Sequence, residues 1–492
     1  MAFVPIQNLG QLGVIADLPA NEIPENALTA ARNVSFRNNN IEPASGYLQI
    51  YSIFGTGLIN GLLGIRTPDA LQRRWFTCTP TQIIIHTATG TFLDVTRDNG
   101  AFVKVPYTGT NFDKWTNFAF NGFAYFNNGV DVPQVYVDAV STLTVQNVDG
   151  WNPLWRAKSM RAYKNAIIAM NMTENSVNLP HLLRFSDTAS PGARPTQWTA
   201  LSTNKAGSTP IAETQGGIID GEQLGDSFIF YKQDSYYRMT FIGGNDVYRF
   251  QKIADSAGLL APNCVVEYPG GHFCLGNGDV YTHNGGQPTS LLEGRRKEEL
   301  RALIDSSFIR TAFVTINPQK KECWVCFPVV GSGTPACTRA FTWNWETNAW
   351  SDRDLPSSYI GATGQIDTTV FSSQLINEND ESLIIAGLDR KLYLVNAART
   401  NNGTNMSQTV TRQGLHFGDQ LTVKTARAFI PNIVGTIGDT FSIELGSQTK
   451  LDGPVVYAAP YNFILGTSVQ VSAIKTGRYH AYRITYAGAN AW

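Results

Sequence analysis

Few side chains of this chain stand at spacings that support chemistry. Cys323 and Cys326 have the CxxC spacing of a zinc-ligand pair, but no second CxxC and no HxxxH follows them. Residues three apart on a strand point to opposite faces, so these two sulfurs would not converge on one ion. We therefore predict no metal site and six buried free thiols. The six cysteines are Cys78, Cys264, Cys274, Cys323, Cys326 and Cys337.

Histidines and carboxylates offer two weaker possibilities. His272 and His283 flank one predicted hairpin and are the nearest approach to a metal pair. Asp352 and Asp354 are close in sequence, but such a loop pair is more often solvated than used as general acid and base. No G-x-S-x-G, P-loop, H-E-x-x-H or EF-hand string occurs. The sequence predicts no cofactor and no enzymatic activity; a glycosidase would need two carboxylates about 5–10 Å apart in a cleft.

Clusters of aromatic residues support a binding function as an alternative. Aromatic side chains would stack on sugar rings in a glycan-binding propeller, either a receptor-binding protein or a lectin; the candidates are Trp343, Trp345 and Trp350, or Tyr236 and Tyr237. Packing in the core and between sheets is the simpler interpretation, because aromatic side chains often fill the ends of strands.

The element that must position these residues is a strand-turn-strand unit. Residues 272–275 predict one strand, Asn277-Gly278 a type I′ turn, and residues 280–282 the returning strand. Similar units recur roughly every 40–50 residues as far as residue 395, which is the spacing of propeller blades. We predict an all-β fold with a β-propeller-like domain of six or seven blades. A stack of unrelated β-sandwiches is the alternative.

Composition agrees with this fold and limits the partners. Among 492 residues, 44 are glycine and only 16% are charged, which favours short strands joined by tight turns. The formal net charge of −1 gives no long-range attraction to nucleic acid or to an anionic membrane, and leaves room only for local patches. No apolar run approaches the roughly 18 residues of a membrane span, and the first residues lack the pattern of a signal peptide. We expect folding in the cytosol.

Changes in composition divide the chain into four parts. In the first, residues 25–33 predict a short helix and Asn38-Asn39-Asn40 a turn. In the second, residues 188–221 predict a long surface loop and residues 293–308 an amphipathic helical insertion. The predicted parts are an N-terminal lead-in segment (1–51), the propeller-like domain (52–397), a polar linker (398–408) and a C-terminal antiparallel β-sandwich (409–492).

The segment IADLPANEIPENALTAARNVSFRNNNIEPASGYLQIY, residues 15–51, resembles the opening of tail proteins from short-tailed, podovirus-type bacteriophages. In those proteins a similar motif precedes a long β-rich region. The resemblance covers about the first tenth of the chain, and Ile23 and Ala27 depart mildly from the motif. The matching residues are Asp17, Pro19, Glu22, Pro24, Asn26, Arg32, Asn33, Phe36, Arg37 and Gly46.

The resemblance implies a structural virion protein, a tail tube nozzle or tail-hub subunit, made in the host cytoplasm and located in the tail. It implies a cyclic homo-oligomer of about six copies around the DNA ejection channel, in contact with the adaptor ring and with a tail fibre or spike. Because the axis of a propeller is filled or narrow, we expect DNA to pass along the symmetry axis of the ring. The wall should lack a dense Lys/Arg stripe, since strong phosphate pairing would stall transit.

Two groups of residues are candidates for contacts with these partners. Asp17, Asn26 and Arg32 belong to the N-terminal motif. The cluster Arg295, Arg296 and Lys297 lies in the predicted helical insertion and would touch a neighbouring subunit or DNA, although a solvated helix face is the simpler interpretation. We predict no catalytic, cofactor-binding or metal-binding residue.

Overall fold

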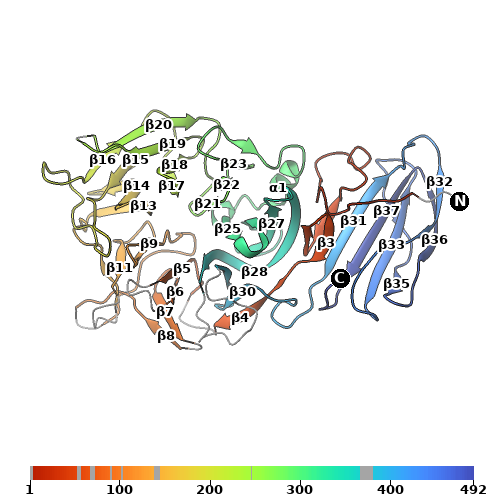
Figure 1. Cartoon of the computed structure of the whole chain (residues 1–492). Coiled ribbons are helices and arrows are strands. Elements are labelled where there is room, and N and C mark those ends of the chain that lie inside the picture. The colour runs from red at the N-terminus through yellow and green to blue at the C-terminus, as the bar shows by residue number, and fades with distance from the viewer. Residues whose placement is uncertain are drawn as a thin grey trace.

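The computed structural model describes residues 4–51, 57–66, 73–88, 91–100, 103–137, 144–244, 246–365 and 381–492. Its strands form a ring of blades with a smaller layered unit beside it (Figure 1). The prediction of an all-β fold, with a β-propeller-like domain and an additional small antiparallel β-sandwich, is confirmed.

Five blades are separate four-stranded sheets in which each strand pairs antiparallel with the next one along the chain. This order needs only short connections between neighbouring strands. They are blade 1, with β5 (Gly61–Arg66), β6 (Arg73–Cys78), β7 (Ile83–Ala88) and β8 (Thr91–Asp94); blade 2, with β9 (Phe118–Phe120), β10 (Phe123–Phe126), β11 (Gln134–Tyr136) and β12 (Gln146–Asn147); blade 3, with β13 (Trp155–Tyr163), β14 (Ala166–Glu174), β15 (Val177–Phe185) and β16 (Gly207–Pro210); blade 4, with β17 (Ile218–Leu224), β18 (Ser227–Lys232), β19 (Tyr236–Phe241) and β20 (Tyr248–Ala254); and blade 5, with β21 (Val265–Tyr268), β22 (Gly271–Leu275), β23 (Val280–His283) and β24 (Thr289–Ser290).

Two more four-stranded units lie within a larger sheet and share the long strand β28 (Ala349–Gly364). Residues 349–354 of β28 pair with β27 and complete blade 6; residues 358–364 pair with β29 and begin blade 7. The outer strand of blade 7 is β4 (Gly46–Tyr51), which precedes blade 1 in the chain, so the two ends of the propeller close on each other. The other strands are β25 (Phe313–Asn317), β26 (Glu322–Phe327) and β27 (Cys337–Asn344) in blade 6, and β29 (Ser382–Gly387) and β30 (Leu392–Ala398) in blade 7.

Apolar clusters between blades hold the ring together. Phe76 of blade 1 and Phe126 of blade 2 share one buried cluster, and the following blades are joined by similar clusters. Ile384 of blade 7 and Trp75 of blade 1 share another, so the last blade packs against the first. Each blade buries its faces on its neighbours, which explains why the predicted units cannot fold as isolated hairpins.

The β-sandwich is built from both ends of the chain. Its main layer runs from β1 (Ala30–Arg32) through β31 (Gln408–Leu415) and β37 (Tyr479–Tyr486) to β33 (Thr440–Gln448), with β34 (Val456–Tyr457) and β35 (Tyr461–Ile464) paired to β33. Two short sheets pack with it: β2 (Val34–Arg37) with β3 (Asn40–Pro43), and β32 (Lys424–Phe429) with β36 (Val471–Gly477). Val34 and Phe36 share a buried core with Phe441 and Tyr486. The predicted separation of residues 1–51 from the sandwich at 409–492 is therefore wrong.

Strand β1 joins the propeller to the sandwich. It pairs parallel with β28, where Arg32 lies opposite Asp352, and antiparallel with β31, where Ala31 lies opposite Val410. One continuous sheet of 13 strands therefore spans both parts. The short helix predicted over residues 25–33 is wrong because the backbone polar groups of this segment find partners on two other strands.

Three further local predictions differ from the structure. The turn after β22 spans residues 276–279 and has a positive φ only at Gly278, so it is not the type I′ turn that was predicted. The predicted loop 188–221 contains β16 and the start of β17. In contrast, the turn predicted at Asn38-Asn39-Asn40 is confirmed: Asn38 and Asn39 have φ of 49° and 63° between β2 and β3.

Helical structure is scarce. Helix α1 spans Lys297–Leu303. The described residues also contain two short 3-10 helices, η1 (Ile309–Thr311) and η2 (Pro318–Lys320). The helix predicted over 293–308 is thus real but shorter, because residues 293–296 form a turn and Ile304 is extended. Among the residues that the structure describes, no helix is both long and apolar enough to cross a bilayer.

The shared core makes a prediction about stability. Replacing Phe36, which is 3% exposed, by alanine should lower the free energy of unfolding by about 3 kcal/mol, because a buried ring is removed from the joint core. Urea denaturation followed by tryptophan fluorescence measures this. Phe112→Ala is the matched control, since Phe112 is 49% exposed and should cost much less. Equal losses in the two variants would contradict a core shared by both chain ends.

Candidate functional site

The N-terminal motif lies at the joint between propeller and sandwich. The Asp17 carboxylate accepts hydrogen bonds from the backbone N–H groups of Glu298 (3.0 Å) and Glu299 (3.1 Å), in the first turn of α1. Arg296, at the N-cap position, makes no side-chain cap of its own. Asp17 therefore serves as the cap of a helix that lies about 280 residues away in sequence.

A second contact at the joint is made by Asn33 and Arg32. The Asn33 amide donates to the Asp354 carboxylate (2.7 Å) and to the Ser407 carbonyl (2.9 Å), and its oxygen accepts from the Asp354 backbone N–H (2.9 Å). Arg32 Nε donates to the same carboxylate at 2.8 Å. Asn33 takes a positive φ of 57°, which turns the chain from β1 into β2. One residue thus ties together β1, β28 and the linker that precedes β31.

Asp352 binds two cations beside this contact. Its buried carboxylate forms ion pairs with Arg296 and Arg339. Arg296 is only 1% exposed, donates to Glu299 Oε2 at 2.7 Å and lies 3.7 Å above the ring of Phe341. Although burial opposes the charged form, the two carboxylates raise the pKa of Arg296. This guanidinium is inside the protein and does not face solvent.

The other predicted interface residues lie nearer the surface. Arg295 donates to the Asn348 carbonyl at 2.7 Å, and its own carbonyl accepts from the backbone N–H groups of Ala16 and Asp17. Lys297 pairs with Asp279 and Glu293. Asn26 donates to Gln11. The structure therefore brings five of the six predicted residues to the joint, all with partners inside the chain, and their contact with another protein stays a prediction.

Charged and polar groups bridge the axis of the propeller. Arg161 of blade 3 pairs with Asp220 of blade 4 (2.6 Å) and donates to Asn263 Oδ1 (2.7 Å). Asn263 in turn donates to the Trp115 carbonyl, just before blade 2. Lys114 donates to the carbonyls of Pro262 and Ala312, which precede blades 5 and 6. Hydrogen bonds thus cross from one side of the ring to the other and leave no passage for duplex DNA at this level.

Protonation in this axial network follows from burial and charge. Burial lowers the pKa of Lys114, whereas Asp220 raises that of Arg161 against the effect of burial. Glu222, also on β17, has its pKa raised to about 7, mainly by burial and partly by Asp220, while Arg161 acts in the opposite direction. Lys114 and Arg161 are committed to partners within the protein.

The two histidines of the predicted hairpin meet at a buried tyrosine. Tyr231 Oη lies 2.6 Å from His272 Nδ1 and 2.7 Å from His283 Nε2. His272 Nε2 lies 2.9 Å from the Gln223 carbonyl and must donate to it; His283 Nδ1 accepts from the Gly285 backbone N–H. These partners assign both tautomers. His283 Nε2 donates to the Tyr231 hydroxyl, the hydroxyl donates to His272 Nδ1, and His272 Nε2 donates to the Gln223 carbonyl. These hydrogen bonds form with both imidazole rings neutral. They join Tyr231 and Gln223 of blade 4 to the two histidines of blade 5.

The cysteines and tryptophans are also interior. All six cysteines are buried free thiols, as predicted, and Cys323 and Cys326 lie in different clusters. Trp343 is 5% exposed, donates to Asn348 Oδ1 and packs against Phe273. Trp350 is fully buried. Of the three tryptophans that a sugar-binding surface would use, only Trp345 keeps a partly exposed ring. Among the described residues no three His, Cys, Asp or Glu side chains are grouped to hold a metal ion.

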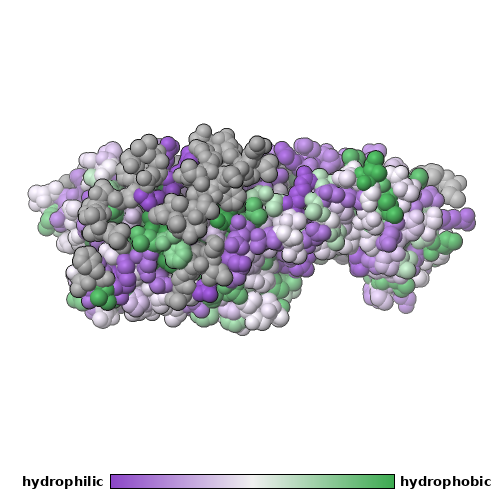
Figure 2. All heavy atoms as spheres, turned by 90° about the horizontal axis from the view of Figure 1, so that it is seen from below, coloured by the Kyte–Doolittle hydropathy of each residue, from purple (hydrophilic) through white to green (hydrophobic). Residues whose placement is uncertain are grey.

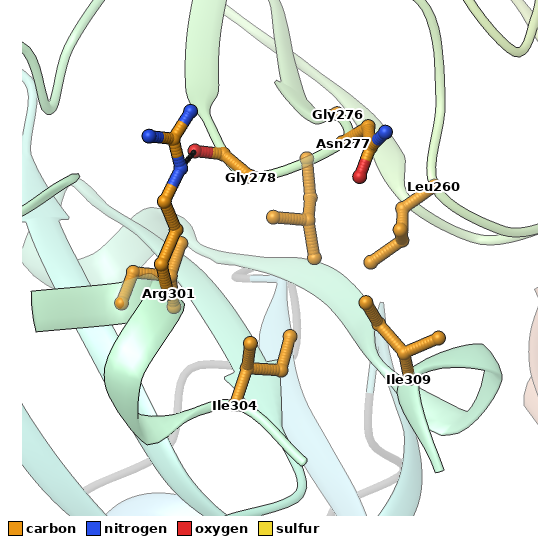
Figure 3. A pocket seen from close by; sticks show the side chains of 9 residues that line it. Leu260, Gly276, Asn277, Gly278, Arg301, Ile304 and Ile309 are labelled. Atoms are coloured by element: carbon orange, nitrogen blue, oxygen red, sulfur yellow. Dashed lines mark hydrogen bonds between the residues drawn. The ribbon is translucent and has the colours of Figure 1, made fainter. Parts of the chain in front are cut away.

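A small cavity of about 290 Å³ lies between α1 and the turn after β22 (Figure 3). Arg301 reaches over it and donates to the Gly278 carbonyl at 3.2 Å, while Ile304 and Ile309, from the segment that follows α1, point toward it from the side opposite the turn. The lining holds no nucleophile and no acid-base pair, so the cavity suits an apolar group. Its lining residues are Leu260, Leu275, Gly276, Asn277, Gly278, Leu300, Arg301, Ile304 and Ile309.

Sequence reasoning missed the axial network and the tyrosine between the histidines. Lys114, Arg161 and Asp220 lie far apart in sequence and form no motif, so only the closed ring brings them together. The spacing of His272 and His283 across one hairpin was a usable signal, since the two residues are direct partners in the strand register.

Comparison with known proteins identifies no family. No family model matches the sequence, and no curated protein matches it. Similar solved structures include the WD40 β-propeller domain of Doa1 (10% identity, 71% of this chain and 97% of that chain, TM-score 0.36). Others are the Neurospora crassa Pan2 WD40 domain (8%, 72% and 95%, 0.39) and PorZ of Porphyromonas gingivalis (10%, 77% and 44%, 0.39). At these TM-scores we base no argument on the similarities, and the fold rests on the strand pairing above.

The contacts of two carboxylates predict that their removal will lower the free energy of unfolding by different amounts. Asp352→Ala should lower the free energy of unfolding by about 3 kcal/mol, because it leaves the buried guanidinium of Arg296 with Glu299 as its one carboxylate and removes the carboxylate partner of the partly buried Arg339. Glu346→Ala is the control: its ion pair with Lys321 is half exposed on both sides, so we expect a loss below about 1 kcal/mol. Chemical denaturation of both variants measures the difference. A small loss at Asp352 would show that the joint does not depend on this charge pair.

The histidine pair predicts a loss of stability in acid. Burial lowers the pKa of His272 to about 4 and that of His283 to about 3, below the ordinary value of 6.5. Between pH 6.5 and these lower pKa values, the two histidines therefore bind more protons in the unfolded chain than in the folded one. The stability from each neutral ring is complete above pH 6.5 and falls by about 1.4 kcal/mol per pH unit toward pH 4. Urea denaturation at pH 7 and pH 5 measures the slope. His272→Gln with His283→Gln should make it shallower; an unchanged slope would contradict the assignment.

Proposed function

We propose that this chain is a structural subunit of a short bacteriophage tail, a nozzle or hub protein without enzymatic activity. Copies of it form a ring, of about six by the family resemblance, around the channel through which DNA leaves the virion. The ring docks to the adaptor ring above and to a fibre or spike at its flank, and DNA passes without sequence-specific binding.

The observation that carries the proposal is the role of the motif residues in the joint. Asp17, Arg32 and Asn33 each bind a group on the propeller, and Phe36 packs in the sandwich core. Gly46 passes so close to the Thr400 backbone that any side chain there would overlap it. In this chain the motif residues therefore help to fix the propeller to the β-sandwich, which supports a structural role for the segment that carries the resemblance.

The bridged axis supports the same proposal. Since Lys114, Arg161 and Asn263 connect opposite sides of the propeller, DNA has no path through a single subunit. A channel would have to form between copies, along the axis of the ring. The continuous sheet through β28, β1 and β31 would keep the two parts of each copy at a constant orientation, which a ring of defined bore needs.

Electron microscopy of the purified full-length protein, alone and after addition of the adaptor protein, tests the proposal. We expect rings with an open centre wide enough for duplex DNA. Asn33→Ala should reduce the fraction of rings severalfold, because it removes the hydrogen bonds to Asp354 and Ser407 that position the sandwich. Arg37→Ala is the matched control, since Arg37 belongs to the same motif and its side chain is exposed.

Two results would count against this function. A monomer at every concentration, with no ring after addition of the adaptor, would contradict the assembly. Specific binding to one sugar in a glycan array, lost on replacing Trp345 by alanine, would instead assign the chain to the glycan-binding alternative.

A further inference from the structure

The outer side of the C-terminal sandwich exposes an unusual number of aliphatic side chains. Of the 22 large hydrophobic residues that are exposed in the described part of the chain, eleven lie between residues 421 and 474. Val434, Ile437 and Val469 are 81%, 83% and 78% exposed. Single exposed apolar residues need no explanation, but a concentration of them marks a binding surface.

Seven of these residues lie on the two-stranded sheet β32–β36 or in its flanking loops, and the other four lie on or beside β34 and β35. Phe429 and Val471 pair in register and turn their side chains into the core, so the alternate residue Ile474 points outward. The loop after β32 meets the turn after β35, since Gly438 donates to the Leu465 carbonyl at 3.0 Å and Ile437 touches Gly466. We call this surface the C-terminal outer face; its exposed aliphatic residues include Leu421, Ile430, Val434, Ile437, Val469 and Ile474.

The C-terminal outer face points away from the propeller. In Figure 1, β32 and β36 form the layer at the far right, beyond β33 and β37. Figure 2 shows green, hydrophobic spheres on the surface of the same end of the molecule, interspersed with purple ones. The face therefore lies at the end of the molecule away from the propeller, where the N-terminus also lies in Figure 1.

The charge of this face has one sign. Residues 420–438 and 464–478 contain no aspartate or glutamate but four cations, and Asp419 and Asp439 directly flank the first of these segments. None of the four forms an ion pair with a carboxylate in the described part of the chain. Lys424 and Lys475 lie on the inner side of the β32–β36 sheet and donate to backbone carbonyls, so Arg427 and Arg478 are the exposed cations of the face. The four cations are Lys424, Arg427, Lys475 and Arg478. A chain with a net charge of −1 thus carries a local positive face.

We propose that the C-terminal outer face binds the surface of an anionic lipid bilayer. Aliphatic side chains would enter the boundary between headgroups and acyl chains, and the cations would pair with lipid phosphates. A second copy seated face to face would bring the two exposed arginines of one copy against those of the other, and a nucleic acid would not use the aliphatic side chains. A lipid surface satisfies both features. This inference goes beyond the proposed tail function and does not rest on ring formation.

Co-sedimentation of the full-length protein with vesicles tests it. We expect binding to vesicles of phosphatidylcholine with phosphatidylglycerol, weaker binding to phosphatidylcholine alone, and partial loss at high salt. Val434→Asp with Ile437→Asp should weaken binding on the order of tenfold, because two inserted side chains become charged. Val177→Asp with Leu201→Asp is the control: both residues are more than half exposed, but they lie on β15 and in the loop after it, in blade 3.

A second variant keeps the test independent of the aliphatic residues. Arg427→Glu with Arg478→Glu should weaken binding to the anionic vesicles and have little effect with phosphatidylcholine alone; thermal melts of all variants confirm folding. No binding to anionic vesicles at low salt would overturn the proposal. So would equal binding by the variants of the C-terminal outer face and the control. Self-association or DNA binding that these substitutions remove, without vesicle binding, would assign the face to a second copy or to nucleic acid.

Discussion

The arrangement of this protein depends on one short strand that has partners on both edges. Strand β1 uses one edge to pair with β28 in the propeller and the other to pair with β31 in the sandwich. An exposed edge on either side would leave backbone groups unpaired, so the insertion satisfies both sheets at once. The side chains around β1 follow from this position: Asp17 caps α1, Asn33 and Arg32 hold Asp354, and Phe36 enters the sandwich core.

Closure of the ring explains the interior of the propeller. The outer strand of blade 7 comes from before blade 1, and apolar clusters join every neighbouring pair of blades. Ionisable side chains in the interior consequently form hydrogen bonds that hold the blades together. Lys114 and Arg161 bridge the axis, and Tyr231 links the histidines of blade 5 to blade 4. Their shifted pKa values arise from burial with internal partners, which supports structural roles for these groups.

The two surfaces with functional meaning lie at opposite ends of the sandwich. At the joint, the motif residues that resemble a phage tail protein set the orientation of the sandwich relative to the propeller. At the far end, the C-terminal outer face combines exposed aliphatic side chains with unpaired cations. A tail subunit built in this way would present its propeller and joint to its neighbours and its sandwich to another surface.

The sequence alone determined the repeating units, the turn at Asn38 and Asn39, the buried cysteines and the alternating strands after residue 408, because these depend on local turn chemistry and on the period of hydrophobic residues. It could not show that residues 30–32 form a strand that pairs with both the propeller and the sandwich, since isolated periodicity does not reveal which distant edge a strand will meet. For the same reason Arg296, which reads as a surface cation, is buried on Asp352, and Lys114 meets carbonyls that lie almost 150 and 200 residues away. Long-range pairing of edges and charges is decided by ring closure, and only the tertiary structure contains that information.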